Sequence, residues 1–214
     1  MPEDKNELKN VFAEIAKKAA VEPEAPAEPK IKRSVVERYA KLLAENGYEI
    51  NADSVGMLAD YLKGYNLWVC GNVGVGKTYF FDSINKIRKN LGYGPIYKLS
   101  MLETQGMKME DVSEWLEYRV GSDILLDDVG AEPEMVSYGM KAEVFPYILE
   151  MRMKLSGRRT HITSNLGPAD ILKRYDRRVS DRFVQFFKME QMKARKSKRT
   201  LVPWNPSKSG EGVL

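Results

Sequence analysis

The chain has 214 residues, of which 43% are apolar and 10% aromatic, so it is long enough to bury a full hydrophobic core. Its single cysteine, Cys70, excludes an intramolecular disulfide framework and fits a reducing compartment. The net charge of +4 is unevenly distributed, since residues 173–199 hold eleven Lys or Arg against three Asp or Glu. This concentration favours a polyanionic partner, although a solvated charged face is the commoner cause of a basic run.

The sequence gives no indication of a membrane segment. No apolar run approaches the roughly 18 residues that a membrane span needs, and residues 1–10 do not resemble a secretory signal. We therefore expect a cytoplasmic protein that does not associate with membranes.

An amphipathic helix is predicted near the N-terminus. Over residues 5–20 the apolar side chains recur at helical spacing, with charges on the opposite face. The apolar positions are Leu8, Val11, Phe12, Ile15 and Ala19. Residues 22–33 form a proline-rich linker, which favours an extended polyproline conformation. We interpret residues 1–21 as a docking helix for a partner protein; the alternative is a helix that folds back on its own domain.

Two further helices are predicted before the first strand. Residues 34–46 open with a possible capping box of Ser34 and Glu37 and end at a glycine. Residues 54–63 follow an Asn-Ala-Asp cap and also end at a glycine.

The apolar residues 67–70 lead directly into the pattern GxxxxGK[ST], which cradles phosphate groups. Its glycines let successive N–H groups point at phosphate oxygens, and the helix predicted over residues 78–88 adds partial positive charge at its N-terminus. Lys77 would contact the β- and γ-phosphates, and the Thr78 hydroxyl would be a Mg²⁺ ligand. The expected nucleotide-binding residues are Gly71, Asn72, Val73, Gly74, Val75, Gly76, Lys77, Thr78 and Tyr79. The alternative is a glycine-rich turn that binds no ligand.

A second strand is expected over residues 96–100 and a helix over residues 109–120. Within residues 123–130, the apolar segment that follows ends in two carboxylates, the first of them fifty residues after the loop lysine. Asp127 would hold Mg²⁺ directly or through water, and Asp128 would orient or deprotonate the attacking water. An ordinary strand that ends in an acidic turn is the alternative.

Residues 139–155 have a helical pattern in which Pro146 implies a kink or a later start. The next strand, residues 158–165, ends in Thr-Ser-Asn at the same edge as the other strands, where a polar side chain can hold a water in line with the γ-phosphate. A strand that simply ends in turn residues explains these letters equally well. His161 lies inside this strand without a carboxylate or cysteine at useful spacing, so we expect a packed or edge residue.

Arginines gather towards the C-terminus. A helix is predicted over residues 168–175, and an arginine-rich segment, residues 177–183, follows it and leads into an apolar run. Guanidinium groups near a phosphate site stabilise charge on the transferring phosphoryl group, in cis or from a neighbouring subunit. Residues 191–214 form a basic, partly disordered tail.

With these motifs in order, residues 34–190 resemble the AAA+ ATPases of the DnaC/DnaI helicase-loader family. The resemblance is carried by residues 71–78, 126–132, 162–166 and 174–183. It implies an α/β fold of the P-loop NTPase type, with three α/β/α layers, a five-stranded parallel sheet in the order 5-1-4-3-2 and no separate C-terminal lid domain. It also places Asn165 at the family's sensor 1 position and Arg182 at its arginine-finger position, with Arg178 as a second basic contact.

The resemblance implies an ATPase, with ATP and Mg²⁺ as cofactors, that loads or regulates a replicative helicase on single-stranded DNA. Residues 5–20 would contact the helicase, basic residues at the sheet edge would contact DNA, and ATP would bind between subunits. Because Asp128 stands where many AAA+ proteins have glutamate, we expect slow hydrolysis that DNA or oligomerisation stimulates.

Three alternatives stay open on the sequence. The first is an IstB-like transposition helper ATPase, which acts on duplex DNA with a transposase. The second is a small-molecule P-loop kinase with an arginine-rich lid, and the third is a nucleotide-gated adaptor with little hydrolysis.

Overall fold

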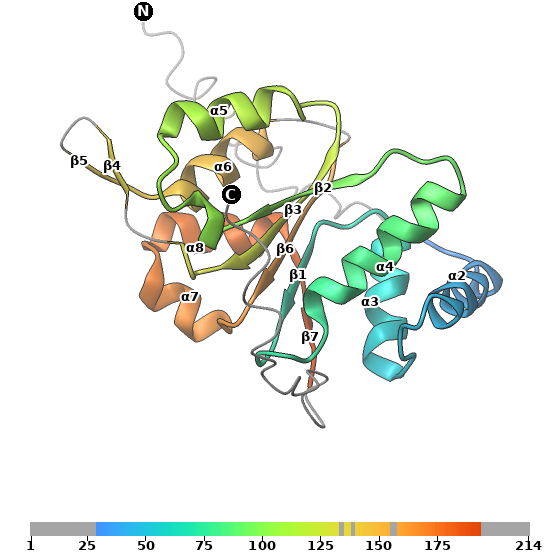
Figure 1. Cartoon of the computed structure of the whole chain (residues 1–214). Helices are drawn as coiled ribbons and strands as arrows, with labels where there is room; N and C mark the ends of the chain where they lie inside the picture. The colour runs from blue at the N-terminus through green and yellow to red at the C-terminus, as the bar shows by residue number, and fades with distance from the viewer. Residues whose placement is uncertain (1–28, 133–134, 138–139, 155–157, 194–214) are drawn as a thin grey trace, which may run out of the picture. The chain divides into compact units, whose positions relative to one another are not determined.

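A parallel five-stranded sheet is the centre of the fold from Ile31 onward (Figure 1). Its strands are β2 (Ile96–Ser100), β3 (Asp123–Val129), β6 (Thr160–Ser164), β1 (Leu67–Cys70) and β7 (Lys188–Gln191), in that spatial order. Every neighbouring pair in this sheet is parallel. Numbered along the chain, the order is 5-1-4-3-2, which confirms the expected topology. The carboxyl ends of β1, β3 and β6 therefore meet at one edge.

The structure is a computed structural model that describes residues 29–132, 135–137, 140–154 and 158–193. The predicted docking helix over residues 5–20 and most of its linker lie outside these residues. The expected lack of a lid domain concerns residues 194–214, which also lie outside them. In the described part of the chain, no helix is long and apolar enough to cross a membrane.

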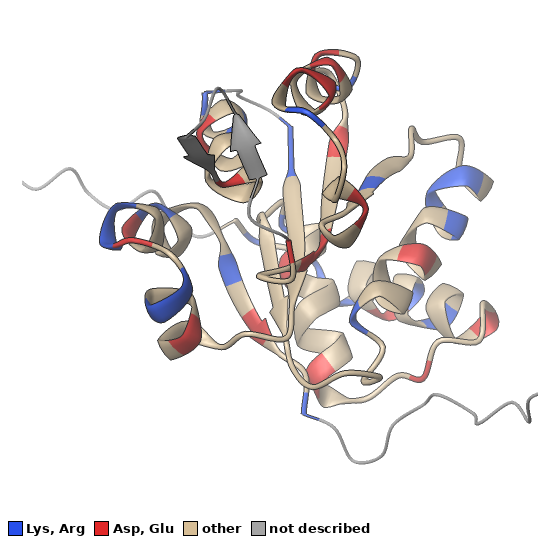
Figure 2. Ribbon diagram, turned by 60° about the vertical axis from the view of Figure 1, so that its left-hand side comes forward, with Lys and Arg blue, Asp and Glu red and all other residues tan. Residues whose placement is uncertain are grey.

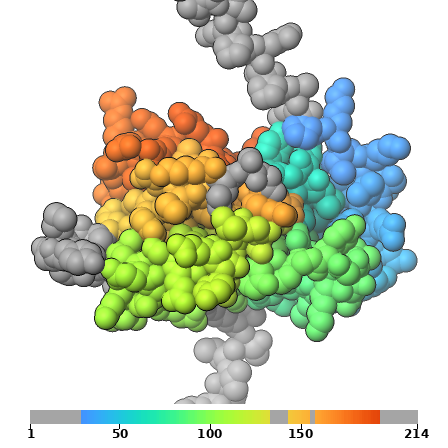
Figure 3. All heavy atoms as spheres, turned by 90° about the horizontal axis from the view of Figure 1, so that it is seen from above, coloured from blue at the N-terminus to red at the C-terminus, as the bar shows by residue number. Residues whose placement is uncertain are grey.

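The sheet has an apolar cluster on each face, and each cluster is covered by its own set of helices (Figure 1). One face is covered by α2 (Arg33–Glu45), α3 (Ala52–Leu62) and α4 (Lys77–Asn90). The other is covered by α5 (Met109–Glu117), α6 (Val144–Met153), α7 (Pro168–Arg174) and α8 (Arg177–Phe186). Figure 3 shows the blue α2 and the orange α8 region on opposite sides of the molecule. The three α/β/α layers are thus confirmed.

Strand β1 explains why both faces are covered. All four of its residues are buried, and successive side chains point to opposite faces of the sheet. Leu67 and Val69 join the cluster under α3 and α4, whereas Trp68 and Cys70 join the cluster under α8. An apolar run without alternation is typical of a strand that is buried on both faces.

The predicted N-terminal cap is present at α3, which begins at Ala52, two residues before the expected start, but the cap predicted for α2 is not. The side chain of Asn51 accepts a hydrogen bond of 2.9 Å from the N–H of Ser54, and the Ser54 hydroxyl accepts one of 2.8 Å from the N–H of Asn51, so the predicted cap is present. The capping box of Ser34 and Glu37 is wrong, because α2 begins at Arg33 and Ser34 lies within its first turn. Glu37 instead forms an exposed salt bridge of 2.8 Å with Arg33.

The segment predicted as one helix over residues 139–155 begins as a strand. Strand β5 (Met140–Ala142) pairs antiparallel with β4 (Met135–Ser137), and α6 starts afterwards at Val144. Pro146 is then the third helical residue, a position where its missing N–H removes no intrahelical hydrogen bond. The later start is therefore confirmed, whereas the helical prediction for residues 140–142 is wrong because β4 pairs with them.

The fifth strand, which the sequence did not locate, follows directly after the apolar run at the end of the arginine-rich segment. Residues 184–186 complete α8, and β7 begins at Lys188, whose N–H donates a hydrogen bond of 2.7 Å to the carbonyl of Asn66. Met192 is buried at the end of the strand. The packed structure therefore continues to Met192.

A short 3-10 turn, η1 (Leu102–Thr104), follows β2.

Candidate nucleotide-binding site

The loop between β1 and α4 is shaped by glycines that no other residue could replace without strain. Gly76 precedes α4 with φ of 99°, in the left-handed region that L side chains rarely adopt. A Cβ at Gly71 would collide with the carbonyl oxygen of Met192. That carbonyl is fixed, because the N–H of Met192 donates a hydrogen bond of 2.8 Å to Cys70 O. Strand β7 thus supports the start of the loop.

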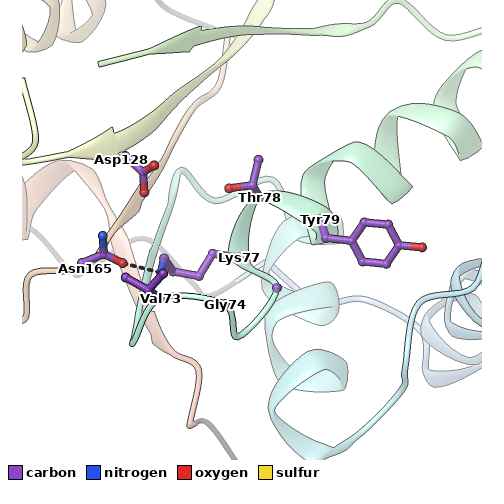
Figure 4. Close-up of a pocket in the computed structure, with 8 residues that line it drawn as sticks. Val73, Gly74, Lys77, Thr78, Tyr79, Asp128 and Asn165 are labelled. Atoms are coloured by element: carbon purple, nitrogen blue, oxygen red, sulfur yellow. Dashed lines mark hydrogen bonds between the residues drawn. The ribbon is translucent and has the colours of Figure 1, made fainter. Parts of the chain in front are cut away.

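Lys77 is 5% exposed and lies at the floor of the site. Its ammonium donates hydrogen bonds to the carbonyls of Gly71 (2.8 Å) and Asn72 (3.0 Å) and to Oδ1 of Asn165 (2.8 Å). Figure 4 shows the side chains of Lys77 and Asn165 directed towards one another. The structure therefore brings together the loop lysine and the strand-end amide that the sequence placed in one site.

Asp127 joins the first turn of α4 to the end of β6. Its Oδ1 accepts a hydrogen bond of 2.7 Å from the Thr78 hydroxyl and one of 2.6 Å from the Thr163 hydroxyl. Asp127 is 8% exposed. Thr78 and Asp127, the two expected Mg²⁺ ligands, are thus adjacent.

Sequence reasoning missed Thr163 as a residue of the site. Besides its bond to Asp127, its hydroxyl accepts a hydrogen bond of 2.9 Å from the N–H of Asp128. Its position two residues before Asn165, on a strand adjacent to β3, could have indicated this role. Thr163 fixes both residues of the Asp-Asp pair.

Asp128 has an unusual backbone conformation. Its φ of 60° is the one positive value at a non-glycine residue in the described chain, and such a conformation costs roughly 1–2 kcal/mol. The register of β3 against β6 also shifts between Leu126 and Val129. Irregularities of this kind re-aim side chains next to functional sites. Here the half-buried Asp128 lines the pocket together with Asn165.

A cavity of about 490 Å³ opens above the loop. It is lined by Val73, Gly74, Gly76, Lys77, Thr78, Tyr79, Asp128 and Asn165. The other expected binding residues do not line the cavity. Gly71 and Asn72 supply the carbonyls that bind Lys77, and Val75 is buried. Tyr79 is 40% exposed, stacks on Tyr48 with ring centroids 5.8 Å apart, and points away from Asn165 (Figure 4).

The two expected arginines lie on α8, outside the lining of the pocket in their own chain. Nη1 of Arg182 is 3.6 Å from Oε2 of Glu150 on α6. Lys154 and Arg182 together lower the pKa of Glu150. Arg178 is exposed on the same helix, and Figure 2 shows the blue basic residues of this part of the molecule. The structure therefore does not bring these two arginines to the pocket of their own chain.

His161 is a packed residue. It is fully buried between the rings of Tyr61 and Phe81, and its Nδ1 accepts a hydrogen bond of 3.2 Å from the N–H of Leu67. Burial lowers its pKa to about 3, so the ring is neutral at physiological pH. Within the described residues, no group of three or more His, Cys, Asp or Glu could hold a metal ion.

No known family model matches the sequence, and no curated protein matches it. Solved structures do match. AMPPCP-bound DnaA from Aquifex aeolicus superposes with a TM-score of 0.51 at 16% identity, covering 69% of this chain and 49% of that chain. The DnaC helicase loader gives 0.51 at 17% identity, covering 73% of this chain and 99% of that chain. The replication initiator DnaA bound to AMPPCP and single-stranded DNA gives 0.50 at 17% identity, covering 72% and 50%.

These likenesses establish the fold. The chain has the fold of the AAA+ P-loop ATPases, in the form seen in DnaC and DnaA. It spans about half the length of the DnaA chains that it matches. The fold and the expected resemblance to DnaC therefore agree.

Proposed function

We propose that this chain binds ATP with Mg²⁺ and hydrolyses it, and that it uses this cycle to load or regulate a replicative helicase on single-stranded DNA. One observation carries the proposal. The hydrogen bonds Lys77–Asn165 and Thr78–Asp127 join the loop after β1 to the ends of β6 and β3, so these four side chains meet at one pocket, which supports the binding of a triphosphate there.

The pocket suits a nucleoside triphosphate. Glycines of the loop present backbone N–H groups at the N-terminus of α4, where phosphate charge is favoured. Lys77 would exchange a carbonyl acceptor for a phosphate oxygen, a stronger and charge-assisted partner. The oxygens of Thr78 and Asp127 fit Mg²⁺, which prefers one or two protein oxygens together with phosphates and waters. When bound, the ion would offset the negative charge of the β- and γ-phosphates.

Hydrolysis requires groups that orient water. Asp128 and Asn165 line the pocket together and are both fixed from below, Asp128 through its N–H to Thr163 and Asn165 through Lys77. We assign to Asp128 the orientation or deprotonation of the attacking water, and to Asn165 its alignment with the γ-phosphate. The shorter aspartate supports slow basal turnover.

Arg182 and Arg178 would complete a neighbouring subunit's site. Both lie on α8 outside their own pocket, and an arginine offered in trans stabilises the charge of the transferring phosphoryl group. Self-association with ATP at the subunit interface then explains why DNA or oligomerisation would stimulate hydrolysis.

Partners are proposed from the fold and from charge. DnaC is a helicase loader, and one matching DnaA structure holds single-stranded DNA. In this chain the basic residues 173–199 favour a polyanion, and the apolar stripe of residues 5–20 favours a protein partner. We therefore assign single-stranded DNA to the basic region and a replicative helicase to the N-terminal segment.

The experiment pairs ATP hydrolysis with a binding assay. Phosphate release by the full chain is measured alone, with single-stranded DNA and with duplex DNA, beside Asp128→Asn, and a replicative helicase is tested for retention on the immobilised chain. We expect stimulation by single-stranded DNA, loss of turnover in Asp128→Asn with retained ATP binding, and retention of the helicase. Failure to retain any helicase together with stimulation by duplex DNA alone would favour the transposition-helper reading. Transfer of phosphate to a nucleoside would instead indicate a kinase.

A further inference from the structure

Glu132 is a buried carboxylate that the proposed reaction does not use. Its side chain has no exposed surface. One oxygen, Oε2, accepts a hydrogen bond of 2.7 Å from the N–H of Gly130, two residues after Asp128. The other oxygen, Oε1, is hydrogen-bonded to the hydroxyl of Tyr175. A single side chain thus spans from the loop after β3 to the junction of α7 and α8.

The contact between Glu132 and Tyr175 is stabilised by a nearby positive charge, and the tyrosine hydroxyl is its donor. Arg174 lies 3.9 Å from Oε1 of Glu132, donates to the Glu132 carbonyl at 3.4 Å, and donates to Glu143 at 3.0 Å. Burial, reinforced by the charge of Glu132, raises the pKa of Tyr175, so its hydroxyl stays protonated and donates. A buried carboxylate without such partners would be strongly unfavourable, so loop and helix junction are held together.

On its upstream side Glu132 holds Gly130, which packs against the turn after Asn165. Gly130 packs so closely on Leu166, which follows Asn165, that a Cβ there would collide with the leucine side chain. The Ser164 hydroxyl donates a hydrogen bond of 2.6 Å to the carbonyl of Val129 and accepts one of 3.0 Å from the N–H of Leu166. The loop that follows Asp128 and the turn that carries Asn165 therefore form one packed unit.

On its downstream side Glu132 is tied to the arginine helix. Tyr175 is separated from α8 by Asp176 alone, whose side chain caps the helix by accepting a hydrogen bond of 2.7 Å from the N–H of Val179. The Tyr175 ring packs on Phe145, with centroids 5.2 Å apart. Because a helix moves as a rigid element, a shift at Tyr175 is carried to the position of Arg182.

We propose that Glu132 is a positioning residue that couples the Asp128 loop of one subunit to the α8 helix which the same subunit offers to its neighbour. When Asp128 and Asn165 move in response to a γ-phosphate, the hydrogen bond between Glu132 and Tyr175 transmits this movement to α8. The positions of Arg178 and Arg182 change as a result. This inference rests on the proposed ATP binding. In an assembly, a subunit that holds ATP would then present its arginines to its neighbour differently from a subunit that holds ADP.

The test separates coupling from a merely structural role. Amide hydrogen exchange is measured over the whole chain with ATP and Mg²⁺, with ADP and Mg²⁺, and without nucleotide, at two protein concentrations. The variants are Tyr175→Phe, which keeps the ring against Phe145 but removes the hydroxyl, and Glu132→Gln. Tyr147→Phe is the matched control, because it removes a half-buried tyrosine hydroxyl bonded to Ser113 at 2.6 Å on the same side of the sheet.

In the unmodified chain and in Tyr147→Phe, we expect ATP to slow exchange in the phosphate loop and to change exchange over residues 177–186. In Tyr175→Phe and Glu132→Gln, the change in the phosphate loop should remain and the change in α8 should be lost, at either protein concentration. A purely structural role would alter α8 equally with and without nucleotide, and that result would overturn the proposal. An ATP-dependent change in α8 that survives Tyr175→Phe would overturn it as well.

The same data keep the two proposals apart. Protection of the phosphate loop without any response of α8 in the unmodified chain would refute the coupling and leave ATP binding intact. A phosphate loop that does not respond to ATP would refute the nucleotide site itself, and the coupling with it.

Discussion

The ammonium of Lys77 donates a 2.8 Å hydrogen bond to Oδ1 of Asn165, which joins the first turn of α4 to the end of β6 across 88 residues of sequence. A group that binds one of these side chains is necessarily close to the other. The floor of the loop and the proposed position of the attacking water are therefore parts of one hydrogen-bonded unit.

Lys77→Ala should abolish nucleotide binding. The variant removes a charge-assisted hydrogen bond to each of two phosphates, and losses of roughly 1.5–3 kcal/mol for each bond weaken binding by more than about 100-fold. Titration with a fluorescent ATP analogue measures this. Lys89→Ala, an exposed lysine at the far end of the same helix, is the control and should bind normally. Near-normal affinity in a folded Lys77→Ala would remove this loop from the nucleotide site.

The Thr78 hydroxyl can be tested by two small replacements. Thr78→Val removes the group that donates to Asp127 at 2.7 Å, whereas Thr78→Ser keeps it. If that hydroxyl is a Mg²⁺ ligand, ATP affinity in Thr78→Val should no longer rise when Mg²⁺ is added, while Thr78→Ser should respond like the unmodified chain. Calorimetry with and without EDTA measures the response. Equal Mg²⁺ dependence in both variants would contradict the assignment.

The residues of the candidate site were easier to predict from the sequence than the residues that hold them in position. Glycine spacing, the loop lysine and the carboxylate pair obey local rules, so Lys77, Thr78 and Asp127 could be placed from letters alone. The bridging role of Thr163 depends on the register of β6 against β3, and the contact of Glu132 with Tyr175 depends on packing between segments 43 residues apart. Neither leaves a periodic pattern in the sequence.

The same distinction holds for the fold. Strands β1 and β3 are largely apolar runs, β2 and β6 are short segments bounded by turn residues, and all four were predicted within two residues of their observed ends. Strand β7 was not located because Lys188 and Glu190 give it a polar composition, and only pairing with β1 makes it a strand. Likewise the pairing of β4 with β5 replaced a helical pattern at residues 140–142. Long-range pairing decided both cases.

Arg182→Ala should leave ATP binding intact and remove the stimulation of hydrolysis by DNA or by self-association. Arg182 lies outside its own pocket, so in the proposed assembly its loss would affect only a neighbour's transition state, where an arginine contributes about 10³–10⁵ in rate. Lys154→Ala is a matched control, since Lys154 is the other cation at Glu150, 3.5 Å away. The measurement is steady-state phosphate release against protein concentration. Undiminished stimulated turnover in Arg182→Ala would argue against a finger supplied in trans.

His161 should make the protein sensitive to acid. Its pKa is about 3 when folded against about 6.5 in an unfolded chain, so below pH 6.5 the unfolded chain takes up a proton that the folded chain does not. The free energy of unfolding therefore decreases as the pH is lowered. This residue contributes a loss of about 2 kcal/mol between pH 7 and pH 5. Denaturant titrations should show this extra loss relative to His161→Gln. In parallel, NMR of the single histidine should show a neutral ring at pH 5, and protonation of the folded protein there would refute the prediction.

Glu190 should make the folded chain less stable as the pH rises, which is the opposite of the effect of His161. Burial, with a hydrogen bond to Asp60 and the charge of that carboxylate, raises the pKa of Glu190 to about 7. The folded chain then holds a proton that the unfolded chain has released, so this contribution to stability is present below about pH 4.5 and is lost as the pH rises through 7. Glu190→Gln keeps a donor for Asp60 without a charge, and its stability relative to the unmodified chain should increase from pH 5 to pH 8. Glu37→Gln, at an exposed salt bridge, is the control. Denaturant unfolding at the two pH values measures the difference, and a Glu190→Gln effect that stays constant or reverses in sign would show that Glu190 does not hold this proton in the folded chain.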